Sequence, residues 1–91
     1  MSRNTVHSLK TEGIYWDAVA AGEKTFEVRR DDRAFQTGDV LHLIRLTPAR
    51  LYDTDGNGLP RVIRKRITYL LQGGQFGIEP GFCVLGLGET P

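Results

Sequence analysis

The sequence predicts an α+β domain that is mostly β, a small barrel of about five strands with one main helix on its side. Three observations predict it. About five short segments have strand-like composition or alternation, glycine-rich turns separate them, and one segment has clear helical spacing. Short strands with glycine-rich turns are typical of small barrels. A chain of 91 residues is too short for two domains, so we expect one domain over residues 1–91.

The N-terminal part predicts a strand followed by the helix. Residues 5–10 alternate loosely, Thr11 is a plausible helix N-cap, and Gly22 ends the helix. The apolar helix residues are three and four apart, so they share one face; they are Ile14, Tyr15, Ala18, Val19 and Ala21. Trp16 lies off this face and is the best candidate for stacking on a base.

The remaining strands follow from alternation and turn residues. In the strand predicted over residues 25–29, Phe26 and Val28 point one way, and the polar residues between them point the other. Further strands are predicted over residues 40–46, 59–71 and 82–87.

Composition and charge exclude several classes of protein. No apolar run approaches the roughly 18 residues of a membrane span, and the N-terminus lacks the apolar stretch of a secretory signal. The single cysteine, Cys83, excludes an internal disulfide and a cysteine-rich zinc site, and in its apolar strand it is most simply a buried small hydrophobe. We therefore expect a cytoplasmic protein with no metal and no cofactor.

The net charge of +1 argues against a protein that coats a polyanion, but the charges are unevenly placed. All 12 Lys and Arg residues lie in residues 1–66, and only Glu79 and Glu89 are charged after that. A local basic surface is compatible with this distribution.

Residues 21–30 (Ala-Gly-Glu-Lys-Thr-Phe-Glu-Val-Arg-Arg) carry the most functional information. If the polar face of this strand meets the helix terminus, Lys24 and Arg29 could hold phosphate, while Glu27 orients the arginine or accepts from a base edge. The alternative is a solvent-facing strand with a Glu–Arg pair, and the pattern alone favours that alternative.

Two further basic clusters have two interpretations each. In residues 29–33 the two aspartates favour a turn with internal salt bridges, which leaves Arg33 open as a phosphate contact. In residues 61–66, Arg64 and Arg66 share a strand face; they could follow phosphates or protect a sheet edge from pairing, and the sequence does not separate these two roles.

Several stretches taken together resemble a known family. They include residues 7–10, 15–19, 22–29 (Gly-Glu-Lys-Thr-Phe-Glu-Val-Arg), 32–41 with its Gly-Asp, 67–71, 76–77 and 81–85. On these residues the chain resembles a short ASCH domain, the activating-signal-cointegrator homology domain of the PUA-like superfamily. Within it, the chain is most similar to the compact bacterial and phage ASCH-like proteins of unassigned function.

The resemblance implies a PUA-like barrel of five or six strands and RNA or nucleotide binding in a cleft between barrel and helix. It places Lys24, Thr25, Glu27 and Arg29 at that cleft. Some ASCH relatives resemble amidohydrolases that deacetylate N4-acetylcytidine; Lys24 matches their motif lysine, while Glu27 stands where they have the catalytic threonine. Others resemble weak metal-dependent ribonucleases.

Three functions remain open at this point. The first is an RNA- or nucleotide-binding module, with candidate contacts Lys10, Lys24, Thr25, Glu27, Arg29, Arg33, Arg64 and Arg66. The second is a small hydrolase on a modified nucleoside or RNA, with Lys24 stabilising charge and Glu27 as general base. The third is a protein-interaction module with a protein partner.

Overall fold

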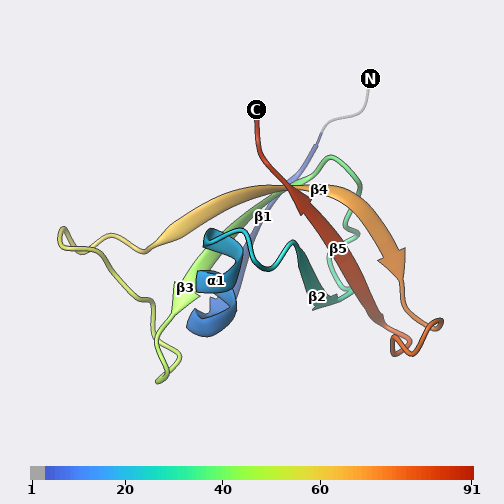
Figure 1. Ribbon diagram of the computed structural model, residues 1–91, viewed down its shortest axis with the longest axis horizontal. Coiled ribbons are helices and arrows are strands. Elements are labelled where there is room, and N and C mark those ends of the chain that lie inside the picture. The colour runs from blue at the N-terminus through green and yellow to red at the C-terminus, as the bar shows by residue number, and fades with distance from the viewer. Residues whose placement is uncertain (1–3) are drawn as a thin grey trace.

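The computed structural model describes residues 4–91 as one five-stranded sheet with one short helix (Figure 1). The elements in chain order are β1 (Val6–Glu12), α1 (Gly13–Ala20), β2 (Phe26–Arg30), β3 (Val40–Leu46), β4 (Val62–Gln72) and β5 (Phe82–Gly88). The prediction of a mostly β domain with one helix is therefore confirmed. Across residues 4–91 no helix has the length and apolar character needed to cross a membrane.

The strands lie in the order β1-β3-β4-β5-β2, so β1 and β2 form the two edges of the sheet. β1 pairs parallel to β3, and the other neighbours are antiparallel. The register of β4 against β5 shifts between Ile67 and Tyr69, and an irregularity of this kind bends a strand. β4 arches over α1 in Figure 1. The sheet does not close into a barrel, and the expected barrel is not confirmed.

The core lies on the inner side of the bent sheet. Alternate residues of each strand point inward because side chains in a strand alternate between faces. The buried residues from the strands are Leu9, Leu41, Leu43, Ile67, Cys83 and Leu85, joined by Val19 from α1 and Phe35 from the β2–β3 loop. Cys83 is fully buried, as expected, and burial raises the pKa of its thiol.

The helix differs from its prediction at its start and in its buried face. Thr11 is not the N-cap: β1 continues through Glu12 in register with β3, and the Thr11 side chain is buried and donates to the Leu9 carbonyl. Ile14 is 71% exposed, and Val19 is the buried residue of α1. Gly22 ends the helix as predicted, with a positive φ of 79° and its N–H bonded to the Val19 carbonyl.

Trp16 is part of the core rather than a free stacking surface. Its ring packs against the core cluster, and its Nε1 donates to the main-chain oxygen of Leu43 over 2.8 Å. This hydrogen bond and the packing of Val19 fix α1 to the inner side of the sheet. The helix face that carries Tyr15 is thereby left available to other contacts.

A buried carboxylate fixes the loop between β2 and β3. Asp39 is 2% exposed and is hydrogen-bonded to His7 Nε2 at 2.8 Å and to the main-chain N–H groups of Thr5 and Gln36. Burial alone would raise the pKa of Asp39, but these hydrogen bonds outweigh burial and hold it below its usual value. The His7 ring also meets Phe35 edge to face. These buried contacts with His7 therefore hold the β2–β3 loop against β1.

Candidate functional site

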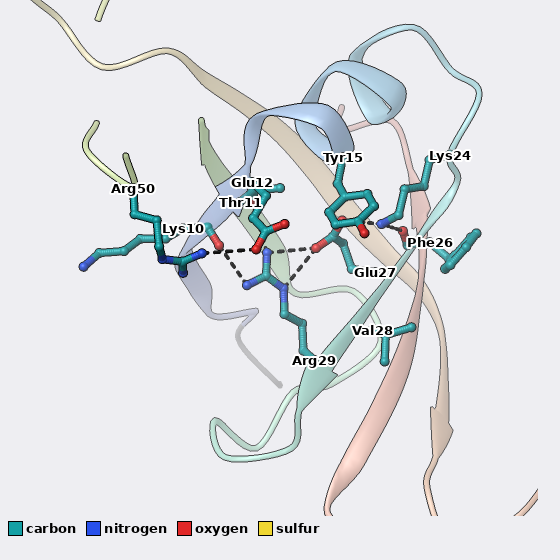
Figure 2. A pocket seen from close by; sticks show the side chains of 10 residues that line it. All are labelled: Lys10, Thr11, Glu12, Tyr15, Lys24, Phe26, Glu27, Val28, Arg29 and Arg50. Carbon is teal, nitrogen blue, oxygen red and sulfur yellow. Dashed lines mark hydrogen bonds and ion pairs between the residues drawn. The ribbon is translucent and has the colours of Figure 1, made fainter. Parts of the chain in front are cut away.

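A pocket of about 520 Å³ lies between the two sheet edges, at the start of α1 (Figure 2). β1, β2, the helix and the loop after β3 all contribute to its wall. The lining residues are Lys10, Thr11, Glu12, Tyr15, Lys24, Phe26, Glu27, Val28, Arg29 and Arg50. This volume falls in the range of small-molecule sites, roughly 300–1,000 Å³.

β2 turns its polar face inward, contrary to the solvent-facing alternative. Glu27 is only 3% exposed, whereas Phe26 and Val28 are 44% and 51% exposed. The pairing of β2 with β5 explains this orientation, because Glu27 and Arg29 stand beside the buried residues of β5 in register. The predicted alternation of β2 is confirmed, but the charged face is the buried one.

The Glu27 carboxylate joins two basic side chains. Lys24 Nζ lies 2.7 Å from Oε1, and Arg29 approaches Oε2 with Nε at 3.0 Å and Nη2 at 2.8 Å. Buried carboxylates need such partners, because an unpaired charge out of water is strongly unfavourable. The three residues form one charged cluster in the pocket wall, which we call the Lys24–Glu27–Arg29 triad.

Arg29 also bridges the two edges of the sheet. Its Nη1 donates to the Lys10 carbonyl and its Nη2 to Thr11 Oγ1, each over 2.9 Å. These bonds run from β2 to β1, where no strand pairing exists. Most donors of the guanidinium are therefore satisfied within the protein, and Arg29 acts first as a connection between the edges.

Lys24 keeps one donor for the pocket. Within residues 4–91 its ammonium uses two of three N–H groups, one to Glu27 and one to the Phe26 carbonyl, each over 2.7 Å. The same ammonium lies between the rings of Tyr15 and Phe26, 5.5 Å and 4.8 Å from their centroids (Figure 2). The pocket thus combines an ordered cation with two half-exposed aromatic rings.

Arg50 reaches the pocket from the loop after β3. Its backbone has a positive φ of 63°, an unusual conformation for a residue with a side chain. Its side chain is 66% exposed and, among residues 4–91, makes one ion pair, from Nη1 to Glu12 Oε1 at 3.1 Å. An exposed pair of this kind is weak, so Arg50 is free to exchange Glu12 for an anionic ligand.

Residues 6–87 match the protein family described as a domain of unknown function (DUF3850). The chain belongs to the DUF3850 family. The matched range includes every residue that lines the pocket. No curated protein matches the chain.

In this DUF3850 domain, four of the eight candidate binding residues line the pocket. Lys24, Glu27 and Arg29, which the ASCH resemblance places at a cleft, do so through their side chains. Lys10 contributes its main chain, because its side chain points away and its ammonium lies 5.8 Å from the Tyr52 ring centroid (Figure 2).

The other four candidates lie elsewhere. Thr25 is exposed outside the pocket, and its carbonyl accepts from the Leu87 N–H. Arg33 donates to the Ser8 carbonyl over 2.9 Å, again from the β2 side to β1. Arg64 and Arg66 are on β4, on the face opposite Ile63 and Ile67, and line no part of the pocket.

Sequence reasoning missed the residues that distant elements bring to the pocket. The apolar spacing predicts Tyr15 on the buried helix face, and nothing in the sequence assigns Arg50 or Glu12 to a site. The unusual backbone at Arg50 has no sequence signal that would mark it. Among residues 4–91, no group of three or more His, Cys, Asp or Glu side chains is arranged to hold a metal ion.

A neighbouring cavity of about 320 Å³ is lined by Gly13, Arg45 and Arg50, among others. Arg45 is already engaged there, with Nη2 2.8 Å from Asp17 Oδ2 and Nη1 2.6 Å from Asp53 Oδ2. These hydrogen bonds lower the pKa of Asp17 and raise the pKa of Arg45. Through Arg45, α1 is attached to the loop between β3 and β4, and Arg45 has little capacity left for a ligand.

Proposed function

We propose that this DUF3850 domain binds RNA or a nucleotide in the pocket between β1 and β2. The observation that carries the proposal is the combination of aromatic rings and paired cations around a nucleotide-sized cavity. Sites for single-stranded nucleic acid combine these features, because aromatic faces stack on bases and basic groups attract the backbone. The ligand would lie between the unpaired edges of β1 (Val6–Glu12) and β2 (Phe26–Arg30), a gap that we call the seam.

The side chains have different roles in this proposal. Tyr15 offers a half-exposed ring for stacking, and Lys24 and Arg50 are the cations with donors to spare. Glu27 orients Lys24 and can accept from a base edge with its remaining lone pairs. Arg29 positions this set rather than serving as a free phosphate ligand.

We further propose that the DUF3850 domain is a short relative of the ASCH domains in the PUA-like superfamily. The support is the motif in residues 22–29, because Lys24, Glu27 and Arg29 from that motif meet in the pocket wall. A cytoplasmic protein fits this proposal, since RNA is present there and the single buried thiol of Cys83 needs no partner.

Fluorescence anisotropy with a labelled single-stranded RNA, and with its DNA equivalent, tests the proposal. We expect micromolar binding that weakens steeply with salt. Arg50→Ala should weaken binding about tenfold and flatten the salt dependence, whereas the matched variant Arg64→Ala should leave both unchanged. A loss in Arg64→Ala alone would move the site to the outer sheet face, and equal losses in the two variants would show that binding is not confined to the pocket. No binding at low salt would favour a protein partner.

A small hydrolase acting on a modified nucleoside is the second candidate. The observation in its favour is the 2.7 Å contact between Lys24 Nζ and Glu27 Oε1 in the pocket wall, a cation beside a general-base candidate. Incubation with N4-acetylcytidine or a short RNA, with and without magnesium, followed by chromatography, tests it. Turnover that disappears in Lys24→Ala would support an enzyme, and no turnover on any of these substrates would remove this candidate.

A further inference from the structure

The pocket is bordered on both sides by main-chain groups that no strand pairs with. In β1, the Thr5 carbonyl accepts from the Val40 N–H. The main-chain groups of odd-numbered residues therefore face β3, and those of even-numbered residues, including Lys10, face the pocket. In β2, the Thr25 carbonyl accepts from the Leu87 N–H, so the main-chain groups of odd-numbered residues face β5. Those of even-numbered residues, including Val28, therefore face the pocket. Both Lys10 and Val28 line it.

Basic side chains occupy three of the main-chain carbonyls along these edges, whereas the Val28 carbonyl has no donor within residues 4–91. Arg29 donates to the Lys10 carbonyl, Arg33 to the Ser8 carbonyl and Lys24 to the Phe26 carbonyl, over 2.7–2.9 Å.

The main-chain N–H groups on these edges, in contrast, remain available to a ligand. Within residues 4–91, the N–H groups of Lys10 and Val28 have no acceptor, because each strand pairs only on its other side. The seam therefore offers donors in excess of acceptors, and the side chains nearest to it, Lys24 and Arg50, add donors and positive charge.

This excess discriminates between two kinds of ligand for a sheet edge. An extended peptide needs donors and acceptors in alternation, and on the β1 side the Ser8 and Lys10 carbonyls are already occupied. A phosphate group presents acceptors only and forms strong charge-assisted hydrogen bonds with main-chain N–H, lysine and arginine. The lining therefore favours phosphate over a peptide strand.

We infer that the ligand of this pocket is held through a phosphate group placed between the two sheet edges, with the N–H groups of Lys10 and Val28 and the side chains of Lys24 and Arg50 as donors. The inference rests on the proposed function and specifies it. The phosphate fixes the ligand at the seam, and the base is left to the aromatic rings. A nucleotide should bind, and the corresponding nucleoside should not bind appreciably.

An NMR titration of the ¹⁵N-labelled protein tests the inference. The probes are adenosine 5′-monophosphate, adenosine, inorganic phosphate and an unrelated extended peptide. We expect the monophosphate and inorganic phosphate to shift the amide signals of Lys10 and Val28, and adenosine to bind at least tenfold more weakly than the monophosphate. A peptide that shifts these amides, or adenosine that binds as tightly as its monophosphate, would overturn the inference.

A matched pair of variants isolates the main-chain donor. Val28→Pro removes the pocket-facing N–H without removing a donor from the β2–β5 ladder, whereas Val28→Ala keeps it. We expect the monophosphate to bind about tenfold more weakly to Val28→Pro than to Val28→Ala. If Val28→Pro does not fold, the amide shifts of the unmodified protein decide.

The outcomes separate this inference from the proposed function. Binding of RNA and of adenosine at the pocket, with no dependence on phosphate, would leave the proposed function standing and refute the phosphate site. Failure of RNA, nucleotide and nucleoside alike to bind would refute both. Binding of inorganic phosphate and the monophosphate at Lys10 and Val28 supports both.

Discussion

Replacing Glu27 with alanine should be one of the most destabilising single changes in the pocket wall. The Glu27 side chain is 5% exposed and makes three charged contacts of 2.7–3.0 Å to Lys24 and Arg29. Removing one partner of a buried ion pair costs about 3–5 kcal/mol, because the remaining charge is left without compensation. The partner side chains are 18% and 21% exposed and can partly rehydrate, so we expect about 3 kcal/mol.

Urea denaturation followed by Trp16 fluorescence measures this effect, because Trp16 is packed against the core in the folded state. A small domain has an m-value of about 1 kcal/mol/M in urea, so a loss of 3 kcal/mol lowers the midpoint by about 3 M. The matched control is Glu12→Ala, which removes an exposed contact to Arg50 and should cost less than about 1 kcal/mol. If both variants lose the same stability, the triad is not a buried anchor and this reasoning fails.

Three other changes have defined outcomes. The pKa of Asp39 in the folded protein is below its usual value, so ionised Asp39 stabilises the fold fully above about pH 4. This stabilisation is lost as the pH falls through the pKa of the folded state. The difference in unfolding free energy between the wild type and Asp39→Asn should therefore shrink in urea melts below pH 4. Gly73→Ala should cost roughly 1–3 kcal/mol because its Cβ would collide with the Phe82 carbonyl, whereas Gly56→Ala meets no neighbour and should stay within about 0.5 kcal/mol; equal midpoints would contradict this. Cys83 should react with a thiol reagent on the order of 100-fold more slowly in the native state than in urea, since its thiol is fully buried with a raised pKa, and rapid native labelling would show local opening of β5.

The strands of the core were predictable because their signals are local. The run predicted over residues 40–46 matches β3 (Val40–Leu46), and 82–87 matches β5 (Phe82–Gly88) to within one residue. β4 begins at Val62 rather than at residue 59, because Pro60 forms an isolated bridge with Thr54 in the long arm between β3 and β4. Alternation predicts a strand, but it does not show at which residue the strand stops pairing with the main sheet and continues into the β3–β4 loop.

The buried face of the helix was not predictable from apolar spacing. Trp16 and Val19 are three apart, as Tyr15 and Ala18 are, and an eight-residue helix has too few turns for the sequence to decide between the two faces. The structure decides through Leu43, whose carbonyl accepts from the Trp16 indole. Burying Trp16 turns Tyr15 toward the pocket, so one tertiary hydrogen bond contributes to both packing and the site.

The site was half predictable for a related reason. Lys24, Glu27 and Arg29 are within six positions of one another, and strand alternation places two of them on one face. Arg50 comes from 21 residues further along, and the pairing of β1 with β3, which sets Leu46 beside Glu12, brings its loop to the pocket. The sequence could suggest a charged pocket wall but not the residue on the opposite wall.

The position of Arg29 determines how binding experiments on this domain must be interpreted. An Arg29→Ala variant removes a positive charge, but it also removes the hydrogen bonds that hold Lys10 and Thr11 of β1 against β2. A loss of RNA affinity in that variant would follow equally from a lost ligand contact and from a widened seam. Arg50→Ala has no such second effect, because the exposed Arg50 side chain pairs with Glu12 alone in the part of the chain that the structure describes. The comparison of these two variants therefore separates the architecture of the seam from the recognition that takes place in it.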